Sequence, residues 1–221
     1  MMPLRVPLLQ LPLLLVLLQL PRAAADCDPS CRGSCQDCSA AEVVAALAAD
    51  AADPAGPRVR TQRFGAFALG RLAGADAEAL GAAGGAEAAV AAMRSFPEDP
   101  TVQVYGADAL AHLALESAPN RAAIGAAGGA EAVAEAMARF PDKSGVQLYG
   151  CAALGVLAQE SPDNRALIVA AGGVGLVEAA LQRFPAEPGI KRDGCLALGH
   201  LAQDSADFAG RAAAIDCAFQ R

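Results

Sequence analysis

Apolar positions recur at helical spacing along most of the chain, and their pattern repeats with a fixed step. A glycine pair at 84–85 returns at 128–129 and again at 172–173, 44 residues later each time. Phe-Pro pairs follow each glycine pair at a constant distance. A period in the forties with helical patterning is typical of a stacked helical array, in which each unit buries its apolar face against its neighbours. The sequence therefore predicts an all-α fold with a distributed core.

Three kinds of helix are expected within each period. Long helices with Ala-Leu-x-x-Leu-Ala strings are expected at 62–73, 103–115, 147–159 and 191–203. Short helices with Asn-Arg-Ala-x-Ile strings are expected at 120–126 and 164–170, with a shortened first copy at 75–82. Middle helices are expected at 86–96, 130–140 and 174–184. The glycine pair permits a sharp turn before each middle helix, and the proline ends it.

A further helix is expected before the first full period. Ser39 is a suitable N-cap, and Glu42 stands three residues later, as in a capping box. Val43, Val44 and Leu47 form one apolar stripe after it. The Asp-Pro-Ala-Gly-Pro string at 53–57 then interrupts the helical pattern.

The strings NRALIVAAGGVGLVEAAL and VQLYGCAALGVLA resemble armadillo repeats, including those of armadillo-repeat-containing proteins and of the armadillo region of leucine-rich-repeat kinases. The resemblance implies a right-handed superhelical solenoid of about 44-residue three-helix repeats. It covers residues 39–216. With repeats delimited as is usual in this family, these residues divide into a partial unit 39–73, full units 75–115, 119–159 and 162–203, and a partial unit 206–216.

The first 25 residues have the composition of a secretory signal peptide. Arg5 precedes a 15-residue apolar run, Val6–Leu20, and Ala23 and Ala25 fit the small-residue cleavage pattern before Asp26. The run is shorter than a bilayer span requires and contains proline and glutamine. This favours a secreted or lumenal protein without a stable membrane anchor, and a cytoplasmic one if the segment is not cleaved.

Four cysteines are concentrated in residues 26–38. In an oxidising compartment, such closely spaced cysteines form two local disulfides, with three possible connectivities. A zinc site of four thiolates is one alternative, although the spacing lacks paired C-x2-C elements, and unstructured thiols are another. The disulfide candidates are Cys27, Cys31, Cys35 and Cys38.

Three further cysteines lie in the repeat region. Cys151 and Cys195 occupy the same place in successive periods, three residues before a leucine, and are therefore expected in the core. One period apart, they are too distant for a disulfide. Cys217 is left over and is a candidate for pairing between molecules.

The charge of the chain argues against nucleic acid and anionic membranes as partners. The formal net charge is −7, and no basic stripe is present. Removal of residues 1–25, which contain Arg5 and Arg22 and no acidic residue, makes the charge −9.

The resemblance implies that the long helices line a groove with an asparagine–tryptophan ladder that grips extended peptides. The tryptophan positions are here Phe67, Asp108, Ala152 and Leu196. The asparagine positions are Arg71, His112, Val156 and His200. None matches the ladder, so only a row of groove sites spaced by roughly 8–10 Å is expected.

Arg63 and Arg192 lie one turn before the groove sites at the two ends, which predicts a groove that is basic at both ends and mixed in its middle. An acidic or extended segment of a partner protein is the expected ligand. The alternative is that these are ordinary solvated positions.

No catalytic constellation is recognisable. His112 and His200 are the only histidines and stand two periods apart, too far to share a metal ion. Nucleophile-elbow, P-loop and dinucleotide motifs are missing from the sequence. The expected function is a non-enzymatic interaction module that uses no cofactor or metal. The alternatives are a structural array that self-associates through an uncapped C-terminal end, and a regulatory region of a larger protein.

Overall fold

The computed structural model describes residues 39–204 together with Phe208, Gly210 and Cys217. Within this part of the chain the fold is all-α, and no strand occurs. The expected signal peptide, the cysteine-rich segment and most of the partial unit 206–216 lie outside the described residues.

The observed helices reproduce the three expected kinds. The described part of the chain opens with α3 (Ala40–Ala51). The long helices are α4 (Val59–Ala82), α6 (Pro100–Ala114), α9 (Ser144–Ala158) and α12 (Pro188–Leu201), and a 3₁₀ turn at Ala202–Asp204 follows the last. The middle helices are α5 (Gly85–Ser95), α8 (Gly129–Arg139) and α11 (Gly173–Arg183). The short helices are α7 (Ala118–Ala126) and α10 (Pro162–Ala170).

Local sequence explains the helix boundaries. The capping box at Ser39 and Glu42 is present and begins α3. The first glycine of each pair has a positive φ of 87°, 79° or 76°, a conformation that side chains other than glycine's rarely adopt, so the predicted sharp turn is confirmed. These glycines are Gly84, Gly128 and Gly172.

Helix α4 combines an expected long helix with the shortened short helix. Its backbone breaks at Asp76, where φ is −154° and ψ is 80°. The carboxylate of Asp76 accepts a hydrogen bond of 2.9 Å from the N–H of Ala79 and so begins the last turns of α4. These turns correspond to the expected short helix at 75–82.

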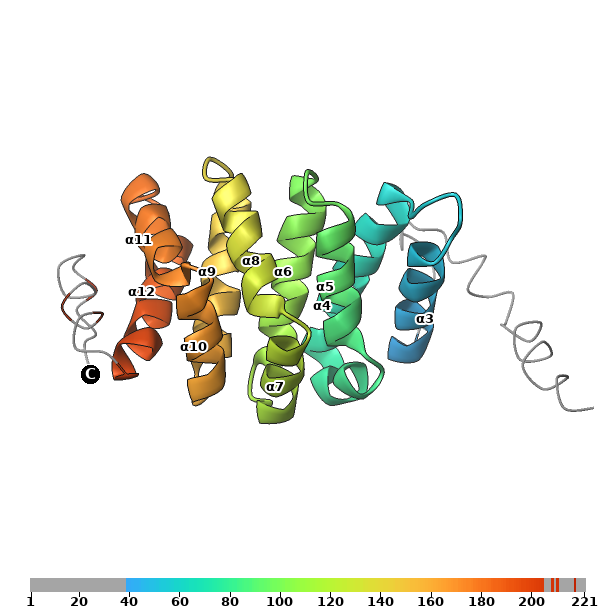
Figure 1. Ribbon diagram of the computed structural model, residues 1–221, viewed down its shortest axis with the longest axis horizontal. Coiled ribbons are helices and arrows are strands. Elements are labelled where there is room, and N and C mark those ends of the chain that lie inside the picture. The colour runs from blue at the N-terminus through green and yellow to red at the C-terminus, as the bar shows by residue number, and fades with distance from the viewer. Residues whose placement is uncertain (1–38, 205–207, 209, 211–216, 218–221) are drawn as a thin grey trace, which may run out of the picture.

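The long helices lie side by side in the order α4, α6, α9, α12, and the short and middle helices pack against them. Figure 1 shows the resulting elongated row, with α3 at one end and α11 and α12 at the other. A single apolar core runs through the row from Leu47 in α3 to Leu201 in α12. The prediction of a distributed core is therefore confirmed.

Buried glutamines join the long helices to the middle helices. The Nε2 of Gln103 donates to the carbonyl oxygens of Met93 and Phe96, at 2.9 and 2.8 Å. Gln147 makes the equivalent bonds one unit later. Each glutamine thus satisfies carbonyl groups at the C-terminal end of a middle helix, which no intrahelical partner reaches.

The Asn-Arg strings form polar contacts between units. The Nδ2 of Asn120 donates to the carbonyl oxygens of Ala77, in the preceding short helix, and Leu113, at 2.8 and 2.9 Å. Asn164 donates to the carbonyl oxygen of Arg121 at 2.9 Å. Both asparagines are buried, so these bonds tie successive units together at fixed register.

The cysteines of the repeat region differ in environment. Cys151 is fully buried in the core, as predicted. Cys195 is only half-buried, and it forms a disulfide with Cys217 of the same chain. Cys195 packs against the core as expected, although it is not fully buried. The expectation that Cys217 pairs between molecules is wrong, because its sulfur is bonded to that of Cys195 in the same chain.

Candidate interaction surface

The solvent-facing side of α4, α6, α9 and α12 forms one surface, which we call the long-helix face. All ten residues expected to line the groove lie on it and are exposed or half-buried. They are Arg63, Phe67 and Arg71 on α4, Asp108 and His112 on α6, Ala152 and Val156 on α9, and Arg192, Leu196 and His200 on α12.

Aromatic side chains occupy positions on α4, α6 and α9 of this face. Phe67 is 39% exposed, and its ring meets that of Tyr105 edge to face with centroids 5.2 Å apart. Tyr149 is half-buried one unit further along. Burial, followed by the nearby charge of Asp108 and by Tyr105, raises the pKa of the Tyr149 hydroxyl. Phe67 and Tyr105 therefore link α4 to α6, and Tyr149 adds a third aromatic residue on α9.

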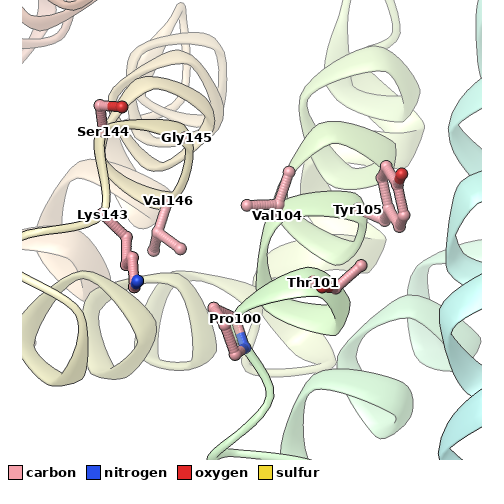
Figure 2. Close-up of a pocket in the computed structure, with 8 residues that line it drawn as sticks. All are labelled: Pro100, Thr101, Val104, Tyr105, Lys143, Ser144, Gly145 and Val146. Carbon is pink, nitrogen blue, oxygen red and sulfur yellow. The ribbon is translucent and has the colours of Figure 1, made fainter.

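A shallow depression of about 280 Å³ lies between the first turns of α6 and α9. Figure 2 shows Pro100, Thr101 and Val104 on the α6 side and Lys143 and Val146 on the α9 side. Tyr105, Ser144 and Gly145 complete its lining. The depression is mainly apolar, and the exposed Lys143 supplies a cation at its edge.

The arginine at the α4 end of the face is paired. The guanidinium of Arg63 forms a bidentate contact with the carboxylate of Asp99, at 2.5 to 3.1 Å. The same carboxylate accepts from the N–H groups of Thr101 and Val102 and caps α6. Burial alone would raise the pKa of Asp99, but the hydrogen bonds from Arg63, Val102 and Thr101 and the charge of Arg63 together lower it.

The arginine at the α12 end is paired as well. Arg192 contacts the carboxylate of Asp193 at 2.6 and 2.9 Å. The expectation of a groove that is basic at both ends therefore needs correction at the α12 end, where Asp193 compensates Arg192. At the α4 end Asp99 compensates Arg63 but not Arg71. Arg71 and Lys143 are exposed and make no ion pair with another described residue, so they carry the uncompensated positive charge of the face.

The two histidines make local contacts rather than a joint site. The Nδ1 of His112 lies 3.0 Å from the carbonyl oxygen of Asp108 and 3.1 Å from its carboxylate. Burial raises the pKa of Asp108, although His112 opposes the shift. The Nδ1 of His200 lies 2.8 Å from the carbonyl oxygen of Gly155 and joins α12 to α9.

Sequence reasoning missed several residues of this face. Tyr105 and Tyr149 were visible as part of a repeated YG string, but their place beside the groove positions became clear only in three dimensions. Lys143 is the N-cap residue of α9, and the equivalent N-cap residue of α6 is Asp99. This reversal of side-chain charge between equivalent positions was the feature of the sequence that pointed to Lys143.

Comparison with known proteins returns no match to any family model, curated protein or solved structure. Among the described residues, no group of three or more His, Cys, Asp or Glu side chains has the arrangement of a metal site. Nor does any single helix of the described part reach the length and apolarity of a membrane span. One bent pair, α10 with α11, passes that test by length and composition only.

Proposed function

We propose that this protein is a non-enzymatic interaction module that binds an extended, acidic segment of a partner protein along the long-helix face. The observation that carries the proposal is the partly exposed pair of Phe67 and Tyr105, which meets where α4 and α6 lie side by side on that face. Aromatic side chains are enriched among residues that dominate binding energy, because they bury a large area at little entropic cost.

Charge supports the choice of an acidic partner. The chain as a whole is negative, at −7, yet Arg71 and Lys143 leave positive charge on this face. Complementary charge guides association and sets the orientation of a bound segment. An apolar side chain of the partner fits the depression beside Val104, with a neighbouring carboxylate near Lys143.

The architecture that we propose is an armadillo-like, right-handed superhelical solenoid with the long-helix face on its concave side. The order of the helices and the uninterrupted core support a repeat array. We propose further that the chain enters the secretory pathway and is secreted or lumenal. The Cys195–Cys217 disulfide supports this destination, because such bonds persist in oxidising compartments and are rare in the cytosol.

Residues at the C-terminal end favour lateral binding over an end-to-end array. In an inner unit Gly125 leaves room for the side chain of Asn164 from the following unit. The same position in α10 is Val169, which is 39% exposed. Phe208 follows Asn164 by 44 residues, the repeat step, and already packs against the core, so a second copy stacked in the same way would have to displace it.

The proposal is tested with peptides selected from a displayed random library on the oxidised protein. We expect the enriched peptides to combine acidic and large apolar residues. Phe67→Ala should weaken their binding at least about tenfold, and Lys143→Glu about five- to tenfold. The matched controls are Val169→Ala, with the same 39% exposure on α10, and Arg139→Glu on α8.

Controls that stay within twofold of the wild type, with large losses for the face variants, support the proposal. Equal losses for both sets, or enriched peptides that are basic, would overturn it. Circular dichroism of each variant separates loss of binding from loss of folding.

A further inference from the structure

A second cavity lies between the middle helices α5 and α8, which pack side by side in the row (Figure 1). Its volume is about 210 Å³. The lining comes from the end of α5, from α6 and from α8, and consists of Met93, Arg94, Pro97, Gln103, Ala132, Glu135, Ala136 and Arg139. None of these is among the ten groove residues of the long-helix face, so the cavity is separate from the proposed peptide site.

The next unit carries a closely related set of residues at the same place, one repeat step of 44 residues later. Five of the eight lining residues return there unchanged, as Met137, Pro141, Gln147, Ala180 and Arg183. The other three differ, from Arg94 to Ala138, from Ala132 to Leu176 and from Glu135 to Ala179. The shared residues belong to the packing of the units, whereas the three that differ set the size and the charge of the α5–α8 cavity.

The alanine at position 132 provides the space. Leu176, at the equivalent place in α11, is half-buried and packs against the core. Ala132 has only a methyl group to place there and leaves the volume of a larger side chain open. A water molecule of the liquid takes up about 30 Å³, so the cavity has room for about seven non-hydrogen atoms.

Two guanidinium groups supply hydrogen-bond donors to the cavity. The Nη2 of Arg94 donates to the carbonyl oxygen of Gly128 at 3.2 Å, and the Nη1 of Arg139 pairs with the carboxylate of Glu98. A guanidinium carries five N–H donors, so both arginines keep donors for a ligand. Because guanidinium groups bind carboxylates through parallel, charge-assisted hydrogen bonds, this part of the lining fits a carboxylate.

The acceptors of the lining fit an ammonium group. Glu135 is exposed and makes no ion pair with another residue of the described part. Gln103 uses both amide donors on the carbonyl oxygens of Met93 and Phe96, so only its amide oxygen can serve a ligand. Met93, Ala132 and two further apolar residues provide the rest of the lining, which suits a short hydrocarbon group.

We propose that the α5–α8 cavity binds a free α-amino acid with a small side chain, such as alanine or serine. Arg94 and Arg139 hold its carboxylate, and Glu135 holds its ammonium group. Its side chain contacts the apolar lining beside Ala132. An α-amino acid carries both charged groups on one carbon, and a cavity of this size with donors and acceptors together requires such a ligand. The site goes beyond the proposed peptide binding and does not depend on it.

The test is equilibrium dialysis of the full chain against radiolabelled L-alanine, with unlabelled competitors. We expect saturable binding of a single molecule per chain, and competition by L-serine. N-acetyl-L-alanine lacks the ammonium group and L-alaninamide lacks the carboxylate, so each should bind at least about tenfold more weakly. L-Tryptophan exceeds the volume of the cavity and should not compete.

Three variants each introduce the residue that the next unit has at the same place, where the fold accepts it. Ala132→Leu fills the cavity and should abolish binding. Arg94→Ala should weaken the binding of L-alanine at least about tenfold. Glu135→Ala should do the same but leave the affinity for N-acetyl-L-alanine unchanged, because that ligand has no ammonium group. The control is Arg183→Ala, which removes the exposed counterpart of Arg139 and should bind like the wild type.

Three results would overturn the proposal. The first is the absence of saturable binding of L-alanine up to about 10 mM, and the second is undiminished binding by a folded Ala132→Leu variant. The third is equally tight binding of N-acetyl-L-alanine, which would assign the cavity to the carboxyl end of a peptide instead. Circular dichroism of each variant establishes that it is folded.

Discussion

Gly81→Ala provides a strict test of how neighbouring units fit together. A Cβ atom on Gly81 would overlap the side-chain oxygen of Asn120 and lie 2.7 Å from its Cγ. Asn120 is 7% exposed and has little room to move. To accept the methyl group it must give up its hydrogen bonds to the carbonyl oxygens of Ala77 and Leu113.

The expected cost follows from these bonds. Each contributes about 0.5–1.5 kcal/mol, so the loss of both destabilises the protein by about 1–3 kcal/mol. Alanine recovers up to about 1 kcal/mol over glycine through its helix propensity. The net loss is therefore between about 0 and 3 kcal/mol, and each kcal/mol lost lowers the melting temperature by roughly 2–4 °C in a chain of this size.

The assay is urea and thermal unfolding of the full chain, followed by circular dichroism. Asn120→Ala supplies the second half of a double-mutant cycle, because it removes the obstruction. In that background Gly81→Ala should be neutral or stabilising. Gly175→Ala is the control, since a Cβ there meets nothing within 4 Å, and it should stabilise by up to about 1 kcal/mol.

Two results would refute this reasoning. One is a gain in stability from Gly81→Ala that equals that from Gly175→Ala. The other is a loss that stays the same when Asn120 is already alanine, which would show that the asparagine does not require the glycine.

Three further changes have defined expectations, all measured by urea unfolding. Asp99→Ala removes the cap of α6 and the partner of Arg63, so it should lower the free energy of unfolding by about 1–2 kcal/mol. Asp142→Ala removes one partner of an exposed ion pair and should lower it by less than about 1 kcal/mol. Equal losses would contradict the capping role of Asp99. Because the folded-state pKa of Asp108 is raised by burial, its ionisation opposes folding. The wild type should therefore gain stability relative to Asp108→Asn as the pH falls through that pKa, and a constant difference would contradict this. Glu116 has a φ of 57°, so Glu116→Gly should stabilise by about 0.5–1 kcal/mol, and a loss would show that its side chain makes a necessary contact.

Much of the fold was predictable from the chain because its determinants are local. The glycine pairs, the Phe-Pro ends and the capping box at Ser39 act within a few residues of where they stand. Cys151 was assigned correctly to the core, because its spacing from a leucine places both on one side of a helix. The ten residues expected to line the groove are exposed or half-buried, which agrees with the same periodicity.

Contacts between distant residues were not predictable in this way. The partners Arg63 and Asp99 stand 36 residues apart, and their pairing depends on how closely α4 approaches the first turn of α6. The charge of the face therefore differed from the expectation. The partner of Cys195 was missed because a cysteine count carries no information about which cysteines meet in the fold.

The sequence by itself determined the all-α repeat character of this protein, because helix periodicity, turn glycines and helix-ending prolines are short-range features that recur with a constant step. Tertiary structure decided which charges on the long-helix face are compensated, which aromatic rings meet there, and that the last cysteine closes onto α12. These properties arise from the packing of one unit against the next, and such packing sets distances between residues that are remote along the chain.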